Sequence, residues 1–428
     1  MSTSADQRLR RTIYIPYMSD HAHAMGAAFR ACGFDAEVLP ESDEQTLTWG
    51  KKYSSGKECF PFICTTGDII KKAKSPDFVP ERAAFFMPTA HGPCRFGQYC
   101  QLHRLILDKL GLAQAMILSP DSKDSYSNIK GLNLNFQIRG WLGILATDIL
   151  EKLARETRPY ELVPGQTDRI YGQCLHLVAQ ATEGKRMALP KTMKVVRRKF
   201  AEIPIDRRNR KPIIGIVGEI YIRSNRFSNN NVVAKVEALG GEAWVAPISE
   251  WVFYTNYMYL AHSRDRGLWI DALKANLKNR VQEWMELLLA RPFHHMLLNA
   301  EEPDTETILG YSTPYMHPSF GGEAILSIGK AIDYINRGAS GIINVMPFTC
   351  MPGLVVTAIS KKFREDFNNI PWLNIAYDGQ EENTAMTRLE AFMHQAREYQ
   401  RWAQGQAKSP QETIPGSQGV ISGSPKLV

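Results

Sequence analysis

The feature that most constrains the fold of this 428-residue chain is an alternation of short apolar runs with segments of helical spacing. Apolar runs bounded by Gly, Pro and polar residues are typical of buried strands, and the order strand–helix–strand predicts a parallel sheet. The expected strands are 12–18, 36–40, 83–87, 115–119, 212–218, 243–248, 341–347 and 372–377. We therefore expect an α/β protein with two parallel-sheet units.

Helical spacing and composition divide the chain further. An N-terminal α/β domain is expected over residues 12–130, a helical connector over 131–210 and a C-terminal α/β domain over 211–403. Residues 250–292 are aromatic-rich and helical, which indicates an insertion or a lid within the second domain. The last segment, 404–428, is rich in Ser, Pro, Gly and Gln, so we expect a disordered tail.

Composition limits the kind of partner. Lysine and arginine number 51 against 44 acidic residues, and a net charge of +7 permits coenzyme A or a nucleotide without indicating nucleic acid. No apolar run is long enough to span a membrane, and the N-terminus lacks the apolar core of a signal peptide. We expect a cytoplasmic protein that binds neither membrane nor nucleic acid. Its seven cysteines, an odd number, argue against a disulfide framework.

Three cysteines share one kind of setting. Cys59 opens a helical stretch, Cys94 stands just before the helix expected at about 98–110, and Cys350 follows a strand and precedes a helix with Pro352 in its first turn. The N–H groups at a helix start lower the pKa of a thiol and favour anionic ligands. These three thiols are therefore candidate ligands of an iron–sulfur cluster.

Spacing alone leaves alternatives open. Three thiolates on a [4Fe–4S] cluster would leave one iron open, and Cys64 and Cys100 are candidates to complete or enlarge the set. The thiols could instead only pack as small apolar side chains, or bind zinc, although the paired C-x-x-C spacing of structural zinc sites is missing. Cys32 and Cys174 lie in helical patterns and are expected in the core.

Several common signatures fail. Residues 50–57 resemble a phosphate loop, but the count is one residue too long and Glu58 stands where Ser or Thr belongs. Neither a dinucleotide-binding glycine pattern after a strand nor a G-x-S-x-G hydrolase motif is present. His91 and His103 flank Cys94; we expect His91 to be a proton donor beside a cluster and His103 to lie on a helix surface.

Four motifs together resemble a known family. They are Lys-Glu-Cys-Phe-Pro-Phe at 57–62 with Thr-Thr-Gly-Asp at 65–68, Gly-Pro-Cys-Arg-Phe-Gly-Gln-Tyr at 92–99, Gly-Glu-Ile-Tyr-Ile-Arg at 218–223 with Phe-Ser-Asn-Asn at 227–230, and Asn-Val-Met-Pro-Phe-Thr-Cys-Met-Pro-Gly at 344–353. These motifs are similar to those of the acyl-CoA dehydratase activase-related proteins, relatives of 2-hydroxyacyl-CoA dehydratase and benzoyl-CoA reductase subunits. The resemblance runs from about residue 12 to 400.

The resemblance implies tandem flavodoxin- or Rossmann-like domains and an oxygen-sensitive [4Fe–4S] or larger iron–sulfur cluster. By motif, its ligands carry over to Cys59, Cys94 and Cys350. It also implies a homo- or heterodimer and an ATP-dependent activase that supplies low-potential electrons. In many relatives an ATPase domain of the acetate-kinase/actin type precedes this region; here none does, so we expect a separate activase protein.

Two hypotheses for function follow. In the first, the protein is a dehydratase- or reductase-like component, a lyase or an oxidoreductase, that acts on an acyl-CoA or passes electrons to a partner. Lys57 and His91 are then candidate catalytic side chains. Glu219, Tyr221 and Arg223, at the end of a strand, are candidate substrate-binding residues in an interdomain cleft. In the second, the protein is a non-catalytic scaffold or assembly protein with a structural metal or free buried thiols.

Overall fold

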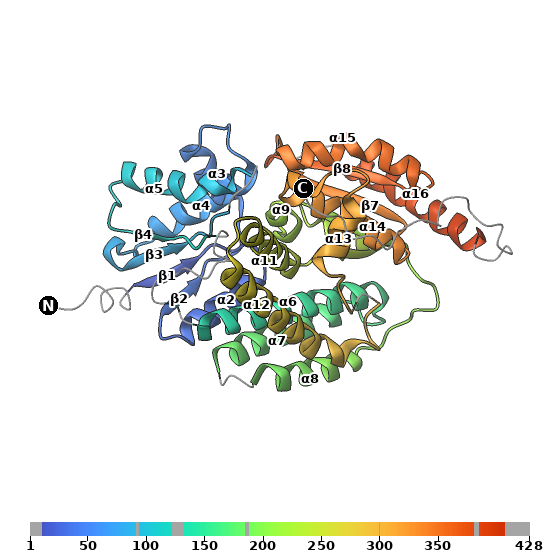
Figure 1. Cartoon of the computed structure of the whole chain (residues 1–428), viewed down its shortest axis with the longest axis horizontal. Coiled ribbons are helices and arrows are strands. Elements are labelled where there is room, and N and C mark those ends of the chain that lie inside the picture. Colours follow the sequence, from blue (N-terminus) through green and yellow to red (C-terminus); the bar gives the residue numbers. More distant parts are fainter. Residues whose placement is uncertain are drawn as a thin grey trace.

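The structure is a computed structural model that describes residues 11–90, 94–121, 132, 134–184, 188–298, 300–380 and 385–406. Two α/β units lie side by side, and a body of helices lies beneath them (Figure 1). This α/β architecture with two four-stranded parallel sheets is the one expected from the sequence. Of the tail expected at 404–428, the first three residues belong to the last helix, and the remainder lies outside the described residues.

The N-terminal unit is a parallel sheet in the order β2-β1-β3-β4. Side chains alternate across it, because successive residues of a strand point to opposite faces. Ile13 and Ile15 of β1 pack with one set of helices, and Tyr14 between them packs with the other. The strands are β1 (Thr12–Ile15), β2 (Asp35–Val38), β3 (Ala83–Phe86) and β4 (Met116–Leu118), and the helices are α2 (His21–Arg30), α3 (Glu44–Tyr53), α4 (Phe60–Ala73) and α5 (Tyr99–Lys109).

Two glycines bring α3 and α4 into unusually close contact. A Cβ atom on Gly50 would lie 2.1 Å from the carbonyl oxygen of Ile63, and one on Gly67 would lie 1.9 Å from that of Thr46. Any larger residue at either position would push the helices apart. The contact fixes the start of α4, where Cys59 stands.

The C-terminal unit repeats this topology, with the order β6-β5-β7-β8. Numbered within each unit, both sheets follow the strand order 2-1-3-4 of flavodoxin-like folds. The strands are β5 (Ile213–Gly218), β6 (Glu242–Val245), β7 (Gly341–Pro347) and β8 (Trp372–Tyr377), and the covering helices are α9 (Ile220–Ser224), α10 (Val232–Ala238), α13 (Thr305–Ser312), α14 (Glu323–Asn336), α15 (Met351–Asp366) and α16 (Ala385–Gln406).

The two units share a core. Ile214 and Ile216 of β5 lie in the same buried cluster as Phe60, Ile63 and Cys64 from the start of α4. At the same junction the Lys51 ammonium group donates to the carbonyl of Gly379 at 3.2 Å. The helix that begins after Cys59 is therefore held directly against the second unit.

The region expected as a connector forms a helical body with its own core. Helices α6 (Leu134–Thr157), α7 (Gln166–Glu183) and α8 (Ala188–Ala201) bury large side chains such as Trp141, Leu150 and Met193 together with Leu289 and Phe293. α6 also packs against α2 and β6, so it touches both α/β units. It therefore helps to set their relative position.

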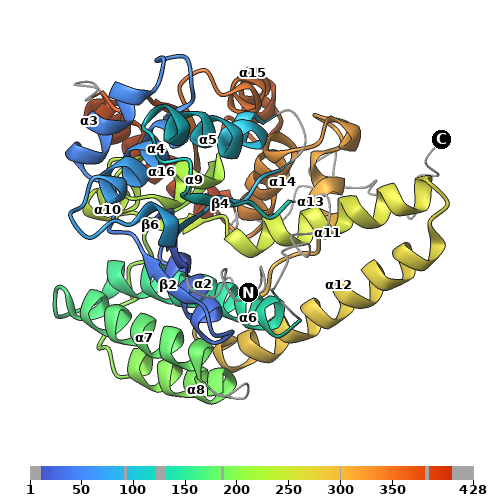
Figure 2. The same cartoon turned by 90° about the vertical axis from the view of Figure 1, so that its left-hand side faces the viewer.

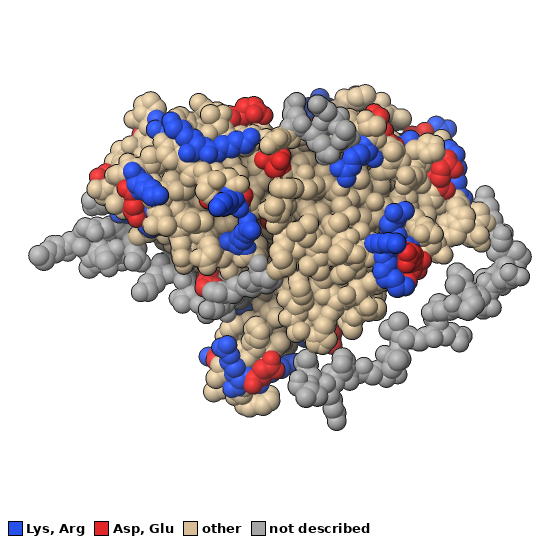
Figure 3. Space-filling model, turned by 90° about the horizontal axis from the view of Figure 1, so that it is seen from above, with Lys and Arg blue, Asp and Glu red and all other residues tan. Residues whose placement is uncertain are grey.

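The expected insertion is a helical hairpin, α11 (Ile248–Asp265) and α12 (Trp269–Ala290), that projects from the body (Figure 2). Where the structure describes the chain, it also contains five short 3-10 helices: η1 (Pro80–Arg82), η2 (Arg95–Gln98), η4 (Arg158–Tyr160), η5 (Arg291–Phe293) and η6 (Pro318–Phe320). On the face shown in Figure 3, lysine and arginine side chains are interspersed with acidic ones.

Candidate functional site

The sequence-predicted ligands lie where the sheet topology favours a binding site. In open α/β sheets, ligands bind at the carboxyl ends of strands where the strand order reverses. In the first unit that point lies between β1 and β3, and Cys94 follows β3. In the second unit it lies between β5 and β7; Glu219 follows β5 and Cys350 follows β7.

Each of the three thiols stands at the start of a helix. Cys59 is the N-cap residue of α4, Cys94 that of η2, and Cys350 that of α15. The Phe96 N–H donates to the Cys94 sulfur at 3.4 Å, and the N–H groups of Phe62 and Gly353 interact with the sulfurs of Cys59 and Cys350. Backbone donors of this kind stabilise and tune bound thiolates.

The three thiols share one electrostatic environment. The negative charge of Glu219 acts on all three, that of Glu323 acts on Cys94 and Cys350, and Cys59 interacts with both other thiols. We call Cys59, Cys94, Cys350, Glu219 and Glu323 the thiol site. Its members come from both α/β units, so the folded chain brings together residues almost 300 positions apart.

The sulfur separation bears on what the site could hold. Among the described residues, one group of His, Cys, Asp or Glu side chains has at least three donor atoms all within 4.8 Å of one another. That group is His21, Asp148 and Glu151, and it does not include the three cysteines. The three sulfurs therefore do not share the close spacing that a single ion needs. Thiolates on an iron–sulfur cluster bind different irons, so the spacing needed for one ion does not apply to such a cluster.

The expectation that helix starts lower the pKa of these thiols is wrong for the metal-free chain. Burial raises the pKa of Cys59, of Cys94 and, to about 12, of Cys350. The negative charges of Glu219 and Glu323 add to the rise, and the backbone N–H groups offset only part of it. Desolvation of a thiolate outweighs a helix terminus here.

The two carboxylates are held by the start of α9. Gly218 has φ +113°, and a Cβ atom there would lie 2.0 Å from the carbonyl oxygen of Val345, so only glycine fits this turn. The turn places Glu219 to accept from the Ile222 N–H at 2.8 Å. Glu323, the first residue of α14, accepts from the Ile220 N–H at 2.8 Å. Two carboxyl groups thus meet at one short helix.

Burial and mutual repulsion keep a proton on this pair. Burial raises the pKa of Glu323 to about 8, with the Glu219 charge as the next cause, and burial likewise raises the pKa of Glu219. Arg223 opposes both shifts, but its guanidinium group is directed to the carbonyls of Gly218 and Pro247, at 2.8 and 3.2 Å. Glu323 therefore retains its proton to higher pH than an ordinary glutamate, and in that form it can donate a hydrogen bond or a proton.

A cavity of about 330 Å³ opens beside the thiol site. Cys94, Tyr99, Glu219 and Glu323 supply polar groups to its wall, while most of the wall is apolar. The apolar side chains come from both units, from α6 and from α11; they include Met25, Phe136, Trp141, Trp251 and Val252. A mostly apolar cavity with a few convergent polar groups is the usual form of a small-molecule site.

Some of the expected substrate-binding and catalytic residues line the cavity and others do not. Glu219 and Tyr221 line the cavity, whereas Arg223 is buried behind it on the two carbonyls. Lys57 is exposed and does not line the cavity; its carbonyl accepts from Arg95 at 2.8 Å. His91 lies outside the described residues.

The two candidate additional ligands also differ. Cys64 is fully buried in the core shared by the two units, and its charge would interact with that of Cys59. Cys100 is half-buried in α5 and packs against the core cluster of the first unit that contains Tyr14 and Cys59. The expectation that His103 lies on the surface is wrong: it is 1% exposed and stacks on Phe62 with ring centres 4.7 Å apart.

Sequence reasoning missed Glu323 and Tyr99. The only signal for Glu323 is its place after Gly321 and Gly322 at the start of a helix, a setting shared by many structural glutamates. Tyr99 stands in the Gly-Pro-Cys motif, and its hydroxyl contacts the Cys59 sulfur. Nothing in the order of residues shows that these side chains meet.

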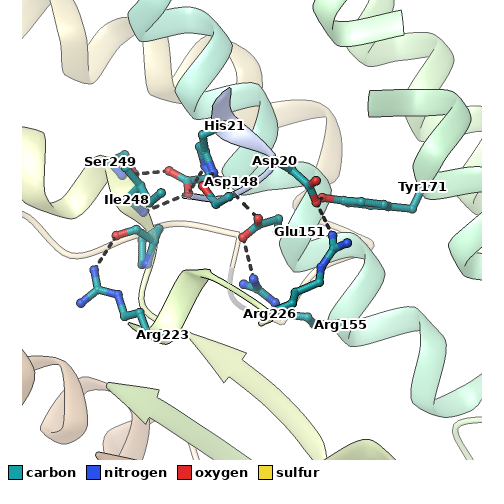
Figure 4. Close-up of polar contacts among 12 residues, drawn as sticks. Asp20, His21, Asp148, Glu151, Arg155, Tyr171, Arg223, Arg226, Ile248 and Ser249 are labelled. Carbon is teal, nitrogen blue, oxygen red and sulfur yellow. Dashed lines mark hydrogen bonds and ion pairs between the residues drawn. The ribbon is translucent and has the colours of Figure 1, made fainter. Parts of the chain in front are cut away.

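A second polar cluster joins the three bodies (Figure 4). Asp148 of α6 lies 2.9 Å from His21 of α2 and accepts the N–H groups of Ile248 and Ser249 at 3.0 Å each, at the start of α11. Glu151 lies 3.8 Å from the other nitrogen of the His21 ring and pairs with Arg155 at 2.6 Å. We call His21, Asp148 and Glu151 the His21 network.

The charges of this network are mutually satisfied. Burial alone would lower the pKa of His21, but Asp148 raises it above its ordinary value; the pKa of Asp148 is lowered despite burial because of the His21 charge. In its protonated form His21 donates to Asp148 at 2.9 Å and to Ser19 at 3.0 Å. A metal ion would have to displace these partners, so we interpret the network as a structural ion pair.

No helix among the described residues combines the length and the apolar character that crossing a membrane requires. No family model matches the sequence, and a search of curated proteins finds no match.

Proposed function

We propose that this chain is an iron–sulfur redox protein related to the 2-hydroxyacyl-CoA dehydratase and benzoyl-CoA reductase subunits, with Cys59, Cys94 and Cys350 as the ligands of a [4Fe–4S] cluster. The single observation that carries the proposal is that these three helix-start thiols, from two α/β units, interact electrostatically, and that Cys94 among them lines a mostly apolar cavity. The same three residues are the ones that the motif resemblance selects.

The chemistry of the donor set supports this assignment. Three thiols with backbone N–H groups at their sulfurs are suited to hold a cluster with one iron open to an exogenous oxygen ligand. When bound, such a group supplies single electrons at low potential. The remaining roles belong to side chains of this chain.

Those side chains form the walls and the proton source of the cavity. The apolar residues exclude water and would hold an acyl chain by burying it. The protonated Glu323 and its neighbour Glu219 would deliver a proton to a departing or reduced oxygen of the substrate. Tyr221 would contact the same ligand, since it lines the cavity.

In this proposal the electrons come from a separate ATP-dependent activase, and the acceptor is an acyl-CoA or a partner protein. The enzyme class would be a dehydratase-like lyase or a reductase-like oxidoreductase. The resemblance of the four motifs supports this part of the proposal, and no group in the structure selects between the two reactions.

One observation favours the second candidate, a scaffold with free buried thiols. The thiols have raised pKa values, and the buried Cys59 contacts the Tyr99 hydroxyl, so the metal-free chain is internally packed at these positions. Such thiols need no metal to be accommodated.

Anaerobic reconstitution with ferrous iron and sulfide separates the two. The redox proposal predicts a brown protein with a broad band at about 400 nm, about four irons and four sulfides per chain, and an EPR signal on reduction. It also predicts that an acyl-CoA perturbs this EPR signal. A colourless, iron-free chain would contradict the cluster assignment, whereas a cluster indifferent to acyl-CoA would contradict only the substrate assignment.

A further inference from the structure

Helix α12 presents large apolar side chains to the outside of the molecule. Trp269, Leu273, Leu277 and Trp284 are 70%, 71%, 66% and 60% exposed. With the other exposed apolar residues of the helix they form what we call the α12 outer face: Trp269, Ile270, Leu273, Leu277, Val281, Trp284, Leu287 and Leu288.

These residues form one continuous stripe. At about 100° per residue, all eight fall within about 120° of the helix circumference, a sector they share with Arg280. The opposite side of α12 faces inward and is mostly small or polar: Ala272, Ala275 and Gln282 are buried against the molecule, and Leu289, near the end of the helix, is its one large fully buried side chain. The usual amphipathic pattern of a surface helix is therefore inverted.

The stripe is large for a monomer. Its two tryptophans alone leave roughly 200–300 Å² exposed, given their exposed fractions and the usual area of an aromatic side chain. The largest apolar patch on a typical monomer is about 300–600 Å². Six aliphatic side chains add to the tryptophans, so this face has the character of an interface.

The order of residues along the stripe indicates what covers it. Three pairs of its residues have sequence midpoints that all fall near residue 279. The pairs are Ile270 with Leu288, Leu273 with Trp284, and Leu277 with Val281. An interface on a two-fold axis must be complementary to itself. When two copies of this helix pack antiparallel about that midpoint, each of these six residues meets an apolar residue.

We propose that a second copy of this chain covers the α12 outer face, with the two α12 helices antiparallel about a two-fold axis near residue 279. A lipid surface fits less well, because a helix lying on a membrane turns a charged face to water, whereas the other face of α12 is packed within the protein. The hairpin projects from the body in Figure 2, so a second copy can reach it.

Dimerisation would also support the cavity. Lys278 and Gln282 line the cavity from the inner side of the same helix. A partner on the outer side would press α12 against the molecule and hold that wall in place. The proposal does not depend on the cluster, and its test uses none.

The test is the mass of the full chain, measured by size-exclusion chromatography with light scattering. The proposal predicts a dimer of twice the 48.3 kDa chain mass at micromolar concentration. Leu277→Glu and, separately, Trp284→Glu should each weaken dimerisation by at least about 100-fold, because two-fold symmetry places every substitution in the interface twice. Leu105→Glu, at a 56% exposed leucine of α5, is the matched control and should remain dimeric.

A mixing experiment tests the antiparallel geometry. Leu277→Glu and Val281→Lys chains should each be monomeric alone and should form a heterodimer when combined, because the two positions face each other across the axis. Circular dichroism checks that each variant is folded. A monomeric wild-type chain, or a dimer that survives both glutamate substitutions, would overturn the proposal. A monomer that co-sediments with phosphatidylcholine–phosphatidylglycerol vesicles would overturn it in favour of a lipid surface.

Discussion

The thiol site and the His21 network are both clusters of metal-ligand residue types at the junction of the three bodies, and they differ in how their groups are satisfied. In the His21 network, the donor atoms lie within 4.8 Å of one another. The Asp148 carboxylate accepts hydrogen bonds from His21 and from two backbone N–H groups. In the thiol site the sulfurs are farther apart, and Cys94, Glu219 and Glu323 open onto a cavity. Proximity of the donor atoms alone selects the His21 network, and His21 also lines that cavity.

The protonation states sharpen the contrast. A buried histidine cation opposite Asp148 lowers the pKa of that carboxyl, whereas Glu219 and Glu323 face each other and the pKa of Glu323 rises to about 8. The first arrangement stabilises the fold. The second favours retention of a proton on the pair, which is typical of functional carboxyl pairs.

The largest expected effect comes from breaking the His21 network. Asp148→Ala should lower the free energy of unfolding by about 3–5 kcal/mol, because it leaves the buried His21 charge without its partner and removes the acceptor at the start of α11. Urea denaturation measures the loss. Glu183→Gln, which breaks the more exposed pair with Arg30, is the control and should cost less than about 1 kcal/mol. An equal, small loss in both variants would show that the network is not a structural joint.

The next effect, expected from the carboxyl pair, is a change in how stability depends on pH. The pKa of Glu323 is about 8 in the folded chain and ordinarily 4.5, so the folded state binds the extra proton between these values. Its contribution to stability is full below pH 4.5 and is lost as the pH rises through 8. In the Glu323→Gln variant without metal, the free energy of unfolding should fall less steeply as the pH rises, by up to about 1.4 kcal/mol per pH unit in that window.

Denaturation of the metal-free protein at several pH values between 4.5 and 8 checks this prediction. Glu365→Gln, an exposed carboxyl-to-amide change, is the control. A Glu323→Gln profile parallel to that of the wild type would show that the pair does not hold the proton.

The smallest expected effect on stability comes from the thiols themselves. Cys350→Ala should change the free energy of unfolding of the metal-free chain by less than about 1 kcal/mol, because Cys350 is only partly buried. Cys174→Ala should cost more, about 1–2 kcal/mol, since that thiol is fully buried in the core of the helical body. The reverse order, measured by thermal unfolding, would assign Cys350 to packing and favour the scaffold hypothesis.

Much of the fold was predictable because it depends on local patterns. Each of the eight expected apolar runs overlaps a strand, and the positions of Cys59, Cys94 and Cys350 at helix starts follow from local sequence. The core shared by α6, α7 and α8 was not predictable, since it depends on Leu289, near the end of α12, and on Phe293, just after that helix. His103 was misplaced because one histidine in a helical pattern does not reveal the Phe62 ring that covers it.

The candidate site was predictable only in part, for a similar reason. Motifs selected the thiols and Glu219, but Glu323 reaches them from about 100 residues farther along the chain through one hydrogen bond to the Ile220 N–H. The direction of the thiol pKa shifts was misjudged because burial, which outweighs the helix starts, depends on the packing of both units.

The most direct test of the central claim is the iron content of Cys350→Ala after anaerobic reconstitution, measured beside Cys174→Ala and the wild type. Cys350 is the one proposed ligand from the second unit, so the comparison asks whether the two units share a cluster. The account predicts about four irons per chain in the wild type and in Cys174→Ala, and loss of most of the iron in folded Cys350→Ala. Equal iron in all three proteins, or none in any, would contradict it.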